Sequence, residues 1–166
     1  MAQRATSAKT SINSKKLPKL FNLGIIKNPT NILDYGCGKY TRHIANHCYA
    51  KLGSTYHGFD PFNQTPEQNE TSLRKIQRLD NVTVTCSNVL NVIDDDETLV
   101  NILERMWKLG DRLIVTVYEG DKSGKGRYTQ YDCYQRNMKL KQYIPFLQQA
   151  GWKNVKSTRG ALTAEK

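Results

Sequence analysis

Several features that would place this chain in a familiar class are missing from it. The four cysteines are scattered, with no C-x-x-C pair and no histidine–cysteine cluster at zinc spacing, which argues against a disulfide framework or a structural metal. No apolar run approaches the ~20 residues of a membrane-spanning helix, and the N-terminus carries no apolar core of signal-peptide length. We therefore expect a reduced, cytoplasmic protein without a membrane anchor.

Acidic residues are also scarce. Lysine and arginine number 25 against 15 aspartates and glutamates, which gives a net charge of +10 with neutral histidines, and no acid precedes the first predicted strand. This excess suits a polyanionic partner, because basic patches release counterions when they bind phosphates. Charge that simply keeps a small protein in solution explains it equally well. A chain of 166 residues fits one domain.

Apolar periodicity predicts alternating strands and helices between residues 31 and 157. This order predicts an α/β fold, a three-layer Rossmann-like sheet that is mostly parallel. Only about twenty residues separate Asp60 from Val82, so we expect an abridged sheet with one strand missing or merged. We expect a single domain (13–158) between a basic flexible tail (1–12) and a loose tail (159–166). Within the domain we also expect an amphipathic lead-in helix (15–26), a hairpin or flexible loop (119–131) and a last helix (138–150).

One strand ends in an unusual turn. Residues Asn31–Tyr35 form a short apolar strand that contains Asp34 and breaks into Gly36 and Gly38, and the next strand ends in Asp60. A strand, glycine turn, helix, strand and terminal acid form a nucleotide-binding half-unit: glycines let the backbone approach a ligand, and the second acid can take both ribose hydroxyls.

The position of Asp34 selects among nucleotide ligands. A carboxylate two residues before the first glycine would repel a pyrophosphate, but it suits the cationic amino-acid end of S-adenosylmethionine (SAM). A dinucleotide site is disfavoured a second time, because Thr41 stands where G-x-G-x-x-G needs its third glycine. The turn therefore points to a methyltransferase with SAM as cofactor and no metal.

Three motifs carry a resemblance to a known family: residues 33–39 (LDYGCGK), Asp60-Pro61-Phe62 and residues 88–93 (NVLNVI). They resemble class I SAM-dependent methyltransferases, and most closely the methyltransferases that accompany DNA-phosphorothioation systems and their phage-encoded relatives. The resemblance implies that the first acid orients the methionine amino group, that the second binds ribose, and that the loop at 87–90 closes over the methyl donor. It implies cofactor-binding roles for Asp34, Gly36, Cys37, Gly38, Tyr40, Asp60, Pro61, Phe62, Asn88 and Val89.

Tyr40 departs from the family pattern, since a third glycine usually occupies that position. Its ring either stacks on the ligand or fills part of the pocket. No obligatory acid–base residue is evident, and Asn88, Tyr118 and Glu119 are weak catalytic candidates. Asn88 is equally suited to capping a loop or helix.

Interleaved lysines and tyrosines in the 119–131 segment and the basic N-terminal segment suit DNA or RNA, although a solvated hairpin also explains the former. Three functions compete: a methyltransferase on nucleic acid, which the charge slightly favours, one on a small molecule or protein, and a catalytically inactive SAM-binding or interaction module. The acceptor atom and the oligomeric state are not encoded in any motif.

Overall fold

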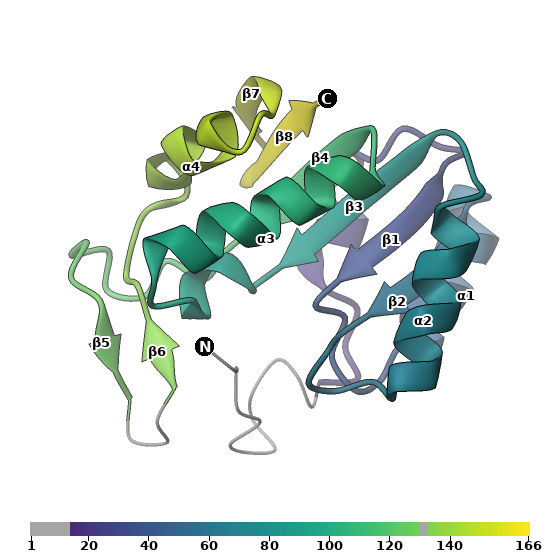
Figure 1. The fold of residues 1–166 in the computed structure, drawn as a ribbon, viewed down its shortest axis with the longest axis horizontal. Helices are drawn as coiled ribbons and strands as arrows, with labels where there is room; N and C mark the ends of the chain where they lie inside the picture. Colours follow the sequence, from purple (N-terminus) through teal and green to yellow (C-terminus); the bar gives the residue numbers. More distant parts are fainter. Residues whose placement is uncertain (1–13, 130–132) are drawn as a thin grey trace.

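The central sheet of the computed structural model joins strands that are distant in the sequence (Figure 1). The structure describes residues 14–129 and 133–166, and within them six strands form one sheet in the order β2-β1-β3-β4-β8-β7. Strands β1 to β4 are parallel, whereas β8 and β7 are antiparallel to their neighbours. The strands are β1 (Asn31–Tyr35), β2 (Thr55–Phe59), β3 (Val82–Ser87), β4 (Arg112–Thr116), β7 (Lys153–Thr158) and β8 (Ala161–Glu165), with a separate hairpin of β5 (Arg127–Tyr128) and β6 (Tyr134–Gln135).

Local capping groups fix where the helices begin and end. The helices are α1 (Arg42–Leu52), α2 (Pro66–Ile76), α3 (Asp96–Leu109) and α4 (Ile144–Gln149), with 3₁₀ turns η2 (Lys19–Asn22), η3 (Leu90–Val92) and η4 (Leu140–Tyr143). Thr65 and Gln68 form a reciprocal capping box before α2, and the Asp95 carboxylate accepts from the Thr98 amide at 2.7 Å at the start of α3. Gly53, at φ +56°, ends α1.

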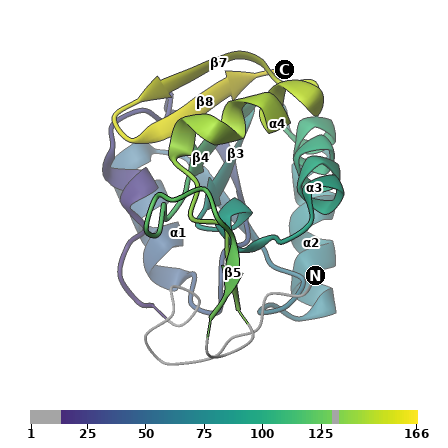
Figure 2. The same ribbon diagram turned by 90° about the vertical axis from the view of Figure 1, so that its left-hand side faces the viewer.

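Helices cover both faces of the sheet (Figure 2). The chain moves outward from β1 to β2 and then reverses to β3, and right-handed crossovers therefore put α1 and α2 on opposite faces. One face buries Ile44 and Cys48 of α1 with Leu20 and Phe21 of η2. The other face, under α2, α3 and α4, holds the larger core. The reversal point lies beside the ends of β1 and β3, where open α/β sheets bind ligands.

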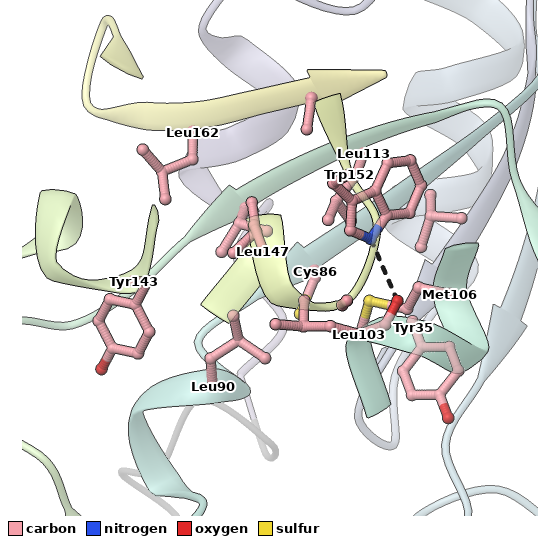
Figure 3. Close-up of a cluster of buried hydrophobic side chains, with 14 of the residues drawn as sticks. Tyr35, Cys86, Leu90, Leu103, Met106, Leu113, Tyr143, Leu147, Trp152 and Leu162 are labelled. Atoms are coloured by element: carbon pink, nitrogen blue, oxygen red, sulfur yellow. Dashed lines mark hydrogen bonds between the residues drawn. The ribbon is translucent and has the colours of Figure 1, made fainter. Parts of the chain in front are cut away.

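The larger core is closed by an indole hydrogen bond (Figure 3). Trp152 is almost fully buried, and its Nε1 donates to the carbonyl of Leu103 in α3 at 3.1 Å. Leu113 of β4 and Leu162 of β8 supply the sheet side of the same cluster. The bond satisfies a polar atom inside the core and ties the segment after α4 to α3.

The abridged parallel sheet expected from the sequence is confirmed. Between β2 and β3 the chain forms only α2, which leaves β2 at the edge of the sheet. A cavity of about 450 Å³ lies against this edge, between α1 and α2, lined among others by Thr41, Tyr56, Gly58 and Gln64. The space where a further strand would pair is therefore open.

The expectation of a loose tail at 159–166 is wrong. Residues Ala161–Glu165 form β8, which lies inside the sheet between β4 and β7 and buries Ala161, Leu162 and Ala164. Arg159 (φ +49°) and Gly160 (φ +81°) make the connection, a two-residue turn with both residues in the left-handed region. Arginine is an unusual residue in such a turn, so the hairpin gave no recognisable signal in the sequence.

Two predicted helices are also shorter than expected. The lead-in segment forms only η2, because Pro18 precedes it and Gly24, at φ +70°, ends it. His43 and His47 of α1 hold this segment through the carbonyls of Lys16 and Phe21, at 3.2 and 3.3 Å. The last helix begins with η4, and its α-helical part starts at Ile144.

A hairpin is present but lies later than the segment 119–131 in which a hairpin or flexible loop was expected, since β5 falls at the end of that segment and β6 beyond it. The basic tail at 1–12 and Tyr131 lie outside the described residues. Among the residues described, no helix is both long and apolar enough to cross a membrane.

Candidate functional site

The site is built where the four parallel strands end, hereafter the C-terminal edge. Gly36 and Gly38 follow β1 with φ values of +84° and +77°, a conformation that glycine adopts without strain. The amides of Gly36 and Cys37 both donate to the carbonyl of Phe59 at the end of β2, at 2.7 and 3.2 Å. The glycine turn is therefore tied directly to the neighbouring strand.

Val89 lies against the glycine turn. A Cβ placed on Gly36 would be 2.3 Å from Val89 Cγ2, so no other residue fits at position 36 without a rearrangement. The preceding residue, Asn88, has φ +57°, and its amide donates to the carbonyl of Thr116 at 2.9 Å. The loop after β3 is thus held by β4 and folded onto the turn after β1.

Asp60 is the centre of a hydrogen-bond network. Its Oδ2 accepts from the Gly38 amide at 2.9 Å and from Asn63 Nδ2 at 3.1 Å, and its Oδ1 accepts from the amides of Phe62 and Asn63, both at 3.0 Å. The side chain is buried, so these four donors replace the water that the charge has lost. Three donors are backbone groups, whereas the Asn63 amide is a side chain that can rotate away.

Two side chains of the following segment fix this network from outside. Asn69 of α2 is buried and bridges the main chain of Asp60: its Oδ1 accepts from the Asp60 amide and its Nδ2 donates to the Asp60 carbonyl, each at 2.9 Å. Gln64 Nε2 donates to the carbonyl of Gly38 at 2.8 Å. Neither role could be predicted from the sequence, because an amide side chain in a polar helix or turn gives no sign of a distant backbone partner.

Asp34 has a different environment. It is buried, with Oδ2 accepting from the Tyr56 hydroxyl at 2.6 Å and Oδ1 from the Thr85 hydroxyl at 2.9 Å. Burial raises the pKa of this carboxyl to about 6, although both hydroxyls favour the charged form. Each oxygen accepts one hydrogen bond and can accept another, so Asp34 has room for an ammonium donor. That it binds one stays a prediction.

Cys37 is not equipped for nucleophilic chemistry. Burial, and then the negative charges of Asp34 and Asp60, raise the pKa of its thiol far above neutral pH. The thiolate is the reactive form, so this cysteine is a packing and turn residue at neutral pH. Its Sγ lies 3.0 Å from the Cβ position that a substituted Gly58 would have, which accounts for the small residue in β2.

The remaining predicted residues lie around the same edge with their side chains turned outward. Tyr40 is 44 % exposed, Phe62 55 % and Tyr118 64 %, and Pro61 lies in the turn between Asp60 and Phe62. Glu119 is already engaged, since its Oε2 accepts from the Leu140 amide at 2.8 Å. The structure thus gathers all the predicted residues at one edge but assigns Glu119 a structural bond.

Two buried polar residues hold the hairpin at this edge: Arg136, which no motif indicated, and Asn91 of the motif at residues 88–93. Arg136 is buried, and its Nε donates to the carbonyl of Ile93 at 2.5 Å while its Nη1 bonds Asp96 at 2.8 Å. Asn91 Nδ2 donates to Gln135 at 3.1 Å. These bonds fasten β6 to η3 and the start of α3, so the segment after β4 has a fixed position relative to the loop that follows β3.

No protein-family profile matches the sequence, and no curated protein matches it. Solved structures do resemble it. Phosphoethanolamine N-methyltransferase 2 of Haemonchus contortus, solved with phosphomonomethylethanolamine and S-adenosylhomocysteine, is 16 % identical over 82 % of this chain with a TM-score of 0.50. A SAM-dependent methyltransferase of Mesorhizobium loti is 9 % identical over 89 % of this chain and 96 % of its own, with a TM-score of 0.47.

The match spans 36 % of the length of the Haemonchus protein, so the chain corresponds to a part of it. At this level of identity the likeness concerns the fold alone. The chain has the Rossmann-like α/β fold, with a mostly parallel sheet, that is found in SAM-dependent methyltransferases.

Proposed function

We propose that this protein is a SAM-dependent methyltransferase that binds its cofactor at the C-terminal edge. One observation carries the proposal: the buried Asp60 carboxylate accepts from the Gly38 amide, so the glycine turn of β1 and the acid of β2 form one unit. Glycine turn and acid are the two parts that a nucleoside ligand requires, and here they are adjacent rather than merely present in the sequence.

The residues fit such a cofactor. The ribose hydroxyls would donate to Asp60 in place of the Asn63 side chain, the one donor in the network that can leave without moving the backbone. The turn at Gly36, Cys37 and Gly38 would lie beside the methionine part. An ammonium group near Asp34 would lower the raised pKa of that carboxyl and hold it charged.

Bound SAM supplies a methyl group that is already electrophilic. The protein's task is then to orient the acceptor, to exclude water and, where the acceptor must lose a proton, to receive it. Tyr118 and Asn88 are the better candidates for contacting the acceptor, because Glu119 is held by the Leu140 amide.

For the acceptor we propose nucleic acid, supported by the net charge of +10 and by the basic hairpin segment. On the three motifs we further propose kinship with the methyltransferases that accompany DNA-phosphorothioation systems and their phage-encoded relatives. We also propose that the protein is located in the cytoplasm. The alternative is a small-molecule acceptor. Transfer of a labelled methyl group, measured with oligonucleotides and with the metabolites of a cell extract, would distinguish the two.

A second candidate function is a non-catalytic module. It is favoured by the four donors that already satisfy Asp60, since a closed network of this kind holds the fold even without a ligand.

Isothermal titration of SAM and S-adenosylhomocysteine into the purified chain tests the proposed function. We expect binding of both, lost in Asp60→Ala and kept in Asp80→Ala, a matched change at an exposed acid between α2 and β3. Absence of any heat signal for either ligand would leave the non-catalytic module as the better account.

A further inference from the structure

Four exposed aromatic rings lie around the C-terminal edge. Tyr40 follows β1, Phe62 follows β2, Tyr118 follows β4 and Tyr128 belongs to the β5–β6 hairpin; their exposed fractions are 44, 55, 64 and 54 %. Of the large apolar side chains that are exposed among the described residues, only Tyr49 and Leu79 are elsewhere, near the last turns of α1 and after α2. Both helices run back from the C-terminal edge, so these two lie toward the opposite edge. We call the four rings the aromatic rim.

Hydrogen bonds hold two members of the rim, Tyr118 and Tyr128, in place before any ligand arrives. Gln135 Nε2 donates to the carbonyl of Tyr118 at 2.9 Å, and the Tyr128 hydroxyl donates to Asp94 at the start of the α3 segment. Arg136 fastens the same hairpin to Ile93 and Asp96. Rings on an anchored support bind at low cost in conformational entropy.

Cations outnumber the neighbouring carboxylates among these rings, five to three, although each carboxylate keeps its negative charge while it accepts a hydrogen bond. Lys15 Nζ is 5.0 Å from the centre of the Tyr40 ring, and exposed cations follow at Lys39, Lys122, Lys125 and Arg127. Among the neighbouring carboxylates, Glu119 accepts from the Leu140 amide, Asp121 from the Ser123 amide and Asp94 from Tyr128. The rim thus presents ring faces together with a net excess of positive charge.

We propose that the aromatic rim binds single-stranded nucleic acid, with unpaired bases stacked on the rings and phosphates beside the lysines. Ring faces can stack only on bases whose own faces are accessible, and a duplex presents base edges instead. Three loops and a hairpin share the rings, which suits an extended strand better than a compact metabolite. The inference rests on the proposed function in that the bound strand would carry the methyl acceptor, but the binding itself needs no cofactor.

Fluorescence anisotropy without SAM tests the rim. The probes are a labelled single strand of mixed sequence, a hairpin duplex of the same composition, and polyglutamate as an acidic chain without bases. We expect the single strand to bind at least about tenfold more tightly than the duplex or polyglutamate. Phe62→Ala and Tyr118→Ala should each weaken single-strand binding by about tenfold, the loss of one stacked base. Tyr49→Ala removes an even more exposed ring at the other edge and should change nothing.

The charges are tested by salt dependence. The double change Lys122→Gln and Lys125→Gln should make the negative slope of log K against log salt shallower by about 1.4, since each phosphate contact on a single strand contributes ~0.7 to its magnitude. Lys51→Gln with Lys108→Gln, at the far ends of α1 and α3, is the matched control and should leave the slope unchanged.

Two results would overturn the rim proposal: duplex or polyglutamate binding as tightly as the single strand, or ring variants that bind like the Tyr49→Ala control. Titration of SAM into the same preparations is read separately. Single-strand binding without SAM binding would contradict the methyltransferase and leave the rim standing, and the reverse result would do the opposite.

Discussion

The amide of Gly38 donates to the carboxylate of Asp60 at 2.9 Å, across 22 residues of sequence. Through this bond the turn after β1 and the end of β2 share one buried charge. Any change to that charge therefore acts on the position of the glycine turn as well as on a ligand.

Asp60→Asn should weaken SAM binding and also reduce stability. The amide keeps the size of the side chain but loses the charge and turns an NH₂ group toward donors that need an acceptor. We expect the dissociation constant for SAM to rise by about 10- to 100-fold and the free energy of unfolding to fall by about 2 kcal/mol. Calorimetric titration and urea unfolding measure the two effects, with the exposed Asp80→Asn as control. Equal SAM affinity in both variants would contradict a ribose role for Asp60.

Gly36→Ala should destabilise the protein through one close contact and through backbone strain. The new methyl group would meet Val89 Cγ2, and alanine is strained at φ +84°. We expect a loss of about 2–4 kcal/mol in the free energy of unfolding. Adding Val89→Ala should restore part of it, which a double-mutant cycle in urea would record as coupling. Strictly additive losses would show that Val89 does not define the space over the turn.

Asp34 should make stability fall as pH rises. Its folded pKa of about 6 lies above the value of 3.8 for an ordinary aspartate, so between these values the folded state binds more protons than the unfolded state. The stabilising effect of the proton is complete below about pH 4 and is lost as pH passes 6, a change of about 3 kcal/mol.

Asp34→Asn supplies the control for this pH effect. The variant has no proton to lose, and one of the two hydroxyls, of Tyr56 or Thr85, can rotate to accept from the new NH₂ group while the other donates to the amide oxygen. The difference in unfolding free energy between wild type and variant should therefore change between pH 4 and pH 7. A difference that is constant with pH would exclude Asp34 as the titrating group.

Leu162→Ala should show that the final strand belongs to the core. Leu162 is fully buried between β4 and α4, so its truncation should cost about 2–5 kcal/mol in urea unfolding. Thr163→Ala, at the adjacent half-buried position on the other face, should cost far less. Similar small losses for both would mean that β8 contributes little to the sheet.

Strong local patterns were sufficient to predict β1 to β4 and the three helices between them. Strands β1 and β4 are short apolar runs and β3 alternates apolar and polar residues, while the distance from Asp60 to Val82 already indicated an abridged sheet. The strand β8 was missed because its turn uses Arg159 in a conformation usually taken by asparagine or glycine.

The two acids of the site were found from their spacing, but their partners were not. Asp34 accepts a hydrogen bond from Thr85, 51 residues later in the sequence. The main chain of Asp60 bonds the side chain of Asn69, which lies inside the polar helix α2. Such pairs depend on strand register and helix placement, which no local pattern encodes. Whether these acids contact a cofactor stays a prediction.

The place of β8 in the sheet sets the order in which the protein can be completed during synthesis. Strand β4 has β3 as a partner early, but its second neighbour is made only after residues 161–165 emerge. Until then the outer row of amides and carbonyls of β4 is unpaired, and β7 lacks the one sheet strand that it pairs with. A nascent chain therefore carries an unpaired edge in the middle of its future sheet, where a strand of another chain could pair.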